Sequence, residues 1–106
     1  MAKFLIRGSY SSEGTKGLLK DGGSARRAAA EALINGLGGR VEAFYFGFGN
    51  HDAYVIADLP DNVTATAVSL AINATGLVTG ETTVLMTPEE VDEAVKKNAS
   101  YRPPGQ

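Results

Sequence analysis

The chain has 106 residues, the length of one small domain, and its 43% hydrophobic and 21% charged residues are ordinary for a soluble globular protein. A net charge of −2 gives no basic surface for nucleic acid, and no apolar run approaches the roughly 20 residues that a membrane helix needs. Cysteine is absent and there is one histidine, so we expect neither disulfides, nor a metal site, nor a cofactor. The first residues do not form the apolar core of a signal peptide, and we expect a cytoplasmic protein.

The first part of the chain predicts a strand and then a helix. Residues 3–10 (KFLIRGSY) favour a strand because β-favouring residues dominate them. The polar stretch at 11–23 contains glycines that disfavour a long helix, so we expect only one short helical turn there. Ser24 is a suitable N-cap for the alanine-rich helix that follows. The glycine pair at 38–39 provides the left-handed exit that helices prefer.

The middle of the chain predicts a hairpin, a helix and another strand. Residues 40–48 and 51–59 are strand-like, and Gly-Asn at 49–50 has the chemistry of a tight turn between them. Residues 62–75 have helical spacing, although their threonines and valine require support from packing. Residues 77–86 predict the last strand, with its internal glycine as a bulge or bend.

The end of the chain begins with a strong helix signal. Thr87-Pro-Glu-Glu combines an N-cap threonine, proline at the first helical position and glutamate three residues after the cap. We therefore expect a single domain over residues 1–97 and a tail at 98–106 that is either flexible or packed on a partner. The predicted order is an α+β, ferredoxin-like βαββαβ with a short C-terminal helix and a four-stranded antiparallel sheet.

The predicted strands carry apolar residues on both faces of the sheet. Phe44 and Phe46 share one face, whereas Val41 and Tyr45 take the other. Because the two crossover helices can cover only one face, we expect the other to pack against a second copy and enclose an apolar cavity. The alternative is that the C-terminal helix and tail fold back over the open face.

Residues 37–61, LGGRVEAFYFGFGNHDAYVIADLPD, together with the first strand and helix, resemble the GYD-domain family. This resemblance implies a small bacterial protein with a ferredoxin-like fold in a dimeric α+β-barrel type of assembly. The family motif, Gly-x-Tyr-Asp, falls on Gly49, Asn50, His51 and Asp52. Histidine here occupies the tyrosine position, so either an imidazole takes over the role of the phenol or this chain lacks that role.

The residues that point to chemistry lie in the predicted strands and hairpin. His51 is the candidate catalytic residue, but its neighbour Asp52 would point to the opposite face and either bind ligand or cap turn amides. Arg7 would clamp an anionic group or form a salt bridge with Asp52 or Asp58. The candidate ligand-binding residues are Arg7, Tyr10, Tyr45, Asp52 and Tyr54.

Three functions are compatible with these observations. The first is a homo-oligomer that binds a small molecule in an apolar cavity between sheet faces. The second is a cofactor-free enzyme of the monooxygenase or isomerase type that uses His51 as proton shuttle, a hypothesis based on fold analogy. The third is a structural or regulatory interaction module without a cavity.

GGSARR at 22–27 has free helix-start amides and arginines, but its spacing is not that of a phosphate-binding loop.

Overall fold

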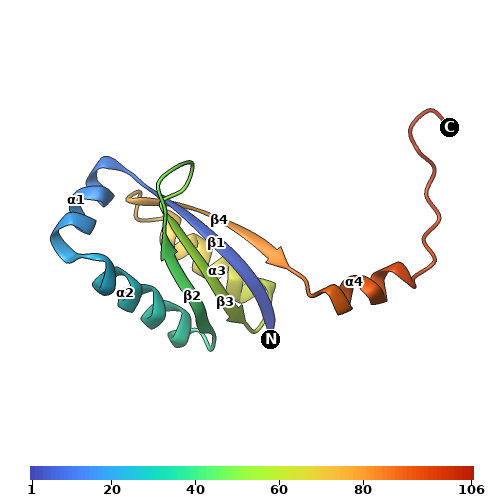
Figure 1. Cartoon of the computed structure of the whole chain (residues 1–106), viewed down its shortest axis with the longest axis horizontal. Coiled ribbons are helices and arrows are strands. Elements are labelled where there is room, and N and C mark those ends of the chain that lie inside the picture. Colours follow the sequence, from blue (N-terminus) through green and yellow to red (C-terminus); the bar gives the residue numbers. More distant parts are fainter.

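The computed structural model describes all 106 residues and has an α+β fold (Figure 1). The chain forms a four-stranded, fully antiparallel sheet in the order β2-β3-β1-β4. This order and the chain path confirm the predicted ferredoxin-like plan, with one helix more than expected. The elements are β1 (Ala2–Tyr10), α1 (Ser12–Asp21), α2 (Gly23–Gly36), β2 (Arg40–Phe46), β3 (Ala53–Leu59), α3 (Asn62–Asn73), β4 (Val78–Leu85) and α4 (Pro88–Val95).

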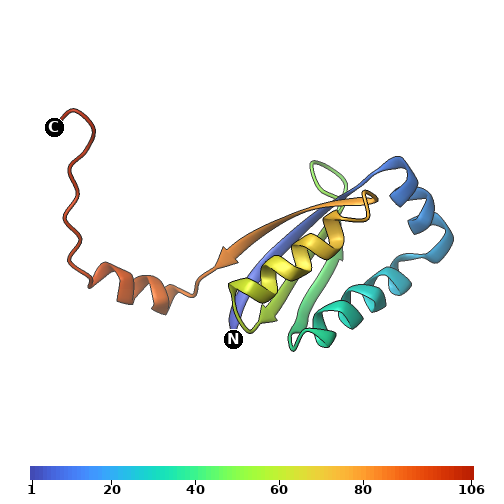
Figure 2. The same ribbon diagram turned by 180° about the vertical axis from the view of Figure 1, so that it is seen from behind.

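The helices α2 and α3 lie on the same face of the sheet, and α1 lies at the end of α2 (Figure 2). The core forms where α2 and α3 meet the strands, and its largest fully buried side chains are Phe4, Leu59 and Val68. Only 12 of the 106 residues are buried, so the single chain has a small core. None of the helices combines the length and the apolar character that crossing a bilayer requires.

The glycine-rich stretch at 11–23 differs most from expectation, because it forms the complete helix α1. The Ser11 side chain caps this helix by accepting a hydrogen bond from the Gly14 N–H (3.1 Å). A Cβ at Gly14 would lie 2.1 Å from the Leu77 carbonyl oxygen, so glycine here allows α1 to pack closely against the chain before β4. The next helix begins at Gly23, after Gly22 with φ of 83°, and not after a Ser24 cap.

The hairpin also differs from the predicted tight turn. β2 ends at Phe46 and β3 begins at Ala53, so residues 47–52 form a loop closed by a hydrogen bond from the Gly47 N–H to the Asp52 carbonyl (2.9 Å). The irregularity in the sheet lies in β2 between Val41 and Ala43, whereas β4 is continuous. Because of this shift, Val41 and Phe44 both lie on the helix-covered face and pack against the core, whereas the sequence predicted opposite faces for them.

The C-terminal segment extends away from the domain. α4 begins with the predicted capping box on Thr87 and Glu90, but it projects beyond the end of β4 together with the tail (Figure 1). The radius of gyration is therefore 16.8 Å, against about 13 Å for a compact chain of this length. In this structure α4 does not fold back over the open face of the sheet, so that alternative is not realised.

Candidate functional site

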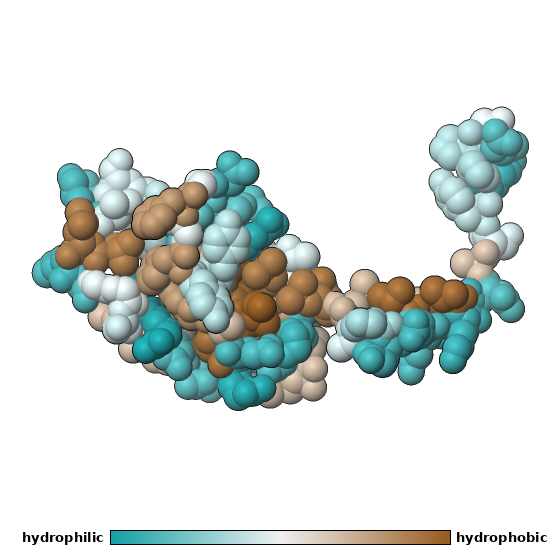
Figure 3. All heavy atoms as spheres, in the orientation of Figure 1, coloured by the Kyte–Doolittle hydropathy of each residue, from teal (hydrophilic) through white to brown (hydrophobic).

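The open face of the sheet is less apolar than the sequence predicted. Apolar side chains such as Leu5 and Ile56 occupy its centre, where they pair across β1 and β3. Charged groups gather on both sides of this centre, and Figure 3 shows the resulting mixture of apolar and polar atoms on the domain. The open face therefore carries two polar clusters separated by an apolar patch.

The first cluster forms a row across all four strands. Arg7 pairs with Glu81 on β4 and with Tyr54 on β3, and Tyr54 pairs in turn with Tyr45 on β2. Directly opposite residues in a sheet point to the same face, so these side chains share the open face. The structure thus brings together three residues that the sequence singled out, Arg7, Tyr45 and Tyr54, and adds an acid.

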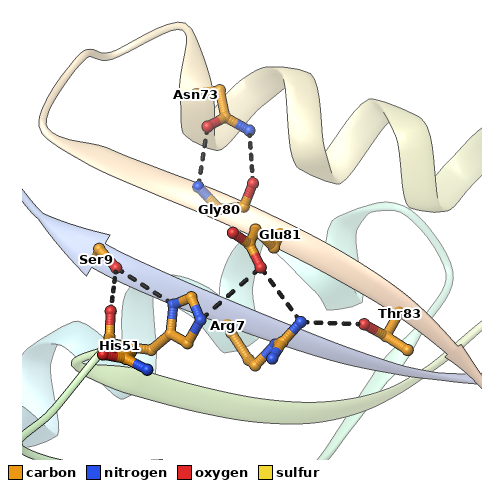
Figure 4. Close-up of polar contacts among 8 residues, drawn as sticks. Arg7, Ser9, His51, Asn73, Gly80, Glu81 and Thr83 are labelled. Carbon is orange, nitrogen blue, oxygen red and sulfur yellow. Dashed lines mark hydrogen bonds and ion pairs between the residues drawn. The ribbon is translucent and has the colours of Figure 1, made fainter.

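Arg7 is the centre of this cluster (Figure 4). Its Nη2 donates to Oε2 of Glu81 at 3.2 Å and to Oγ1 of Thr83 at 3.5 Å. Its Nε is buried and has no hydrogen-bond partner. Since a buried donor without an acceptor is unfavourable, Arg7 retains one hydrogen bond to offer to a further group. The salt bridge expected with Asp52 or Asp58 is formed instead with Glu81.

His51 lies in the loop at the edge of the same cluster. Its Nδ1 is 3.3 Å from the Ser9 hydroxyl oxygen, and its Nε2 is 3.8 Å from Oε2 of Glu81 (Figure 4). The imidazole also meets the Tyr54 ring edge-on, with 6.2 Å between ring centres. Its side chain is only 17% exposed. His51 thus joins the Arg7 cluster through Glu81 and forms no hydrogen bond with Asp52.

Asp52 and Tyr10 lie elsewhere. The Asp52 carboxylate accepts a hydrogen bond from the Tyr10 backbone N–H at 2.8 Å, and the Asp52 N–H donates to the Gly8 carbonyl at 2.8 Å. Asp52 thereby fixes the loop to the end of β1, and its carboxylate accepts from this strand amide and not from amides of its own turn as predicted. The Tyr10 side chain lies on the helix-covered face, beside Gly14 of α1. Neither residue faces the Arg7 cluster.

The second cluster lies at the other end of the open face. Asp58 accepts hydrogen bonds from Lys3 (3.0 Å) and Arg40 (2.9 Å), and Lys3 also bonds to Glu42. The hydrogen bond from Lys3 is the main reason that the pKa of Asp58 lies below its usual value. The pKa of Lys3 is raised, first by Glu42 and then by Asp58. These charges satisfy one another, so this cluster has a structural role.

Three members of the Arg7 cluster were not recognised in the sequence, namely Ser9, Glu81 and Thr83. Glu81 and Thr83 lie in a threonine-rich segment of β4 that has no motif. They reach Arg7 only because β4 pairs antiparallel with β1 in this register. The alternation of apolar residues along β1 and β4 does not by itself give this pairing, so it could not place Glu81 and Thr83 beside Arg7.

The cluster offers a guanidinium, two phenols, an imidazole and a carboxylate beside an apolar patch. Such groups bind and orient a small polar or anionic molecule, and an imidazole next to a carboxylate can transfer a proton. No group of three or more His, Cys, Asp or Glu side chains comes together as a metal site would require.

Comparison with known proteins shows which family the chain belongs to. Residues 4–95 match the GYD domain, a range that contains all four helices and all of the sheet except the first two residues of β1. No curated protein and no solved structure matches the chain. Because the match extends over most of its length, the chain belongs to the GYD domain family.

Proposed function

We propose that this protein is a homo-oligomer that binds a small molecule between open sheet faces, at the cluster of Arg7, Tyr45, His51, Tyr54 and Glu81. The observation that carries the proposal is the buried, unpartnered Nε of Arg7, beside the apolar centre of the uncovered sheet face. A ligand with an acceptor group would satisfy this donor, and a second copy would exclude water from the site.

Two features support self-association. The patch around Leu5 and Ile56 has no helix over it, since α2 and α3 both lie on the opposite face (Figure 2). In addition, α4 carries apolar side chains along one side and hydrophilic ones along the other (Figure 3), with Val91 and Val95 exposed at 44% and 77%. A soluble chain gains stability when such surfaces are removed from water.

Light scattering after size exclusion, at micromolar concentration, tests the assembly. We expect a dimer or larger oligomer, and Ile56→Glu on the open face should shift it toward monomer. Leu70→Glu is the matched control, because Leu70 is exposed (66%) on α3, away from the open face. Circular dichroism should show both variants folded. A monomeric wild type, or equal effects of the two substitutions, would contradict the proposed assembly.

Native mass spectrometry of protein purified from its own host tests the site. We expect a retained small molecule, and Arg7→Gln should lose it because the substitution removes the charge and the free Nε. Arg27→Gln should keep it, since Arg27 lies on α2 and pairs with Glu31 at 3.8 Å. An oligomer with no retained ligand in any preparation would favour the alternative of an interaction module.

A second candidate function is proton transfer by His51 in a cofactor-free reaction. It is favoured by the position of the imidazole between the Ser9 hydroxyl and the Glu81 carboxylate. The retained molecule, released and returned to the wild type in D2O, should then exchange a carbon-bound hydrogen for deuterium, because His51 removes a proton and returns a deuteron. His51→Gln should hold the molecule without converting it. A molecule that stays unchanged in the wild type would leave binding as the function.

A further inference from the structure

We propose a second ligand site, on the opposite face of the sheet between α2 and α3, which takes a small monocarboxylate with a ring-sized apolar body. Its cationic group is Arg26, from the GGSARR stretch that the open-face site does not use. This site is independent of the proposed function, because its residues point to the helix-covered face.

The apolar part of the site is a cavity of about 130 Å³ over β1, β3 and β4. The strands present small residues at its floor, with Gly8 paired to Ala53 and to Gly80 in adjacent strands. Eleven of the 14 residues that line the cavity are hydrophobic. An apolar cavity of about 150 Å³ accepts a benzene molecule, so this one suits a single ring or a short branched chain.

Arg26 provides the polar end. It is the fourth residue of α2, and its Nε is buried without a hydrogen-bond partner. Its guanidinium forms no salt bridge, whereas its neighbour Arg27 pairs with Glu31. A half-buried guanidinium whose Nε has no acceptor, at the edge of an apolar cavity, is complementary to a carboxylate, which can accept two parallel hydrogen bonds from it.

A second cavity, of about 210 Å³, adjoins the first and shares Tyr10, Arg26 and Val78 with it. Glu13 and Asp21 of α1 line this second cavity together with Arg26, so two negative charges lie on that side of the guanidinium. These acids disfavour a ligand with two or more negative charges, such as a phosphate ester. A single carboxylate on Arg26, with its apolar body in the first cavity, agrees with both the volume and the charge.

Benzoate is the probe for this site, titrated into ¹⁵N-labelled protein and followed by amide chemical shifts. We expect saturable shifts at cavity residues such as Ala53 and Gly80, with a Kd on the order of 1 mM or below for a ligand of this size. Benzamide, which has the same shape without the charge, should bind at least about tenfold more weakly, because it cannot form the charge-assisted pair.

Two pairs of variants keep the test specific. Arg26→Gln should weaken benzoate at least about tenfold through loss of the charge-assisted bonds, whereas Arg27→Gln should leave its Kd within about twofold. Ala30→Leu, which places a larger side chain in the cavity, should block binding of benzoate and benzamide, and Ala28→Leu on the exposed side of α2 should not. Absence of saturable shifts in the folded wild type, or an equal effect of the two arginine variants, would overturn the proposal.

Discussion

The close packing of α1 against the chain before β4 predicts opposite effects for two alanine substitutions in one helix. Gly14 and Gly17 are both helical, and neither has a positive φ. A Cβ at Gly17 meets no atom within 4 Å, whereas at Gly14 it would lie 2.1 Å from the backbone oxygen of Leu77. A backbone atom cannot move aside by changing a rotamer, so Gly14→Ala must displace α1 or the start of β4.

The two substitutions should change the free energy of unfolding in opposite directions. Alanine stabilises a helix over glycine by about 0.5–1 kcal/mol, and Gly17→Ala should show most of this gain. Gly14→Ala has the same gain but adds an overpacking cost of about 1–3 kcal/mol. It also strains the Ser11 N–H to Leu77 carbonyl hydrogen bond (2.9 Å), which is worth about 0.5–1.5 kcal/mol. We expect a net destabilisation of about 1–3 kcal/mol for Gly14→Ala.

Thermal and urea unfolding of the wild type and both variants, at one fixed protein concentration, measures these differences. For a domain of this size about 1 kcal/mol corresponds to roughly 4–8 °C in Tm, so the two variants should lie on opposite sides of the wild type. Fixed concentration matters because self-association would raise the apparent stability of all three. A Gly14→Ala variant as stable as Gly17→Ala would refute the close contact between α1 and Leu77.

Three further substitutions test the core, a cap and a helix–strand link. Leu59→Ala should lower the free energy of unfolding by about 2–5 kcal/mol, because Leu59 is fully buried. In the same urea titration, Leu19→Ala should change it by no more than about 0.5 kcal/mol, because Leu19 is 82% exposed. Hydrogen bonds from the backbone N–H and the hydroxyl of Thr64 lower the pKa of Asp61 from 3.8. The Asp61 carboxylate therefore stabilises α3 fully above pH 3.8, and this stabilisation is lost as the pH falls through the lowered pKa. Asp61→Asn should therefore give a shallower loss of unfolding free energy in acid, and a slope equal to that of the wild type would contradict this role. Asn73→Ala removes the side-chain amide whose oxygen accepts a hydrogen bond from the Gly80 N–H of β4 (2.9 Å). It should lower the free energy of unfolding by about 0.5–1.5 kcal/mol and speed the hydrogen exchange of β4 amides. Unchanged exchange would argue against this link between α3 and β4.

The sequence determined the features that depend on neighbouring residues. The order of the strands and of α2, α3 and α4, the glycine exit after α2 and the capping box at Thr87 were predicted, because propensity, caps and turns act over a few residues. The single histidine was also recognised as a candidate, although its partners were not. Local chemistry was sufficient for the fold class.

Tertiary structure alone decided which side chains meet. The pairing of β1 with β4 brings Arg7 to Glu81, and the shift in β2 turns Val41 toward the core. The glycine-rich α1 segment, which local propensity disfavours as a helix, is helical and packs Gly14 closely against Leu77. Strand register and close packing join residues far apart in the chain, and a shift of one position moves every side chain to the other face. Neighbouring residues therefore do not specify these contacts.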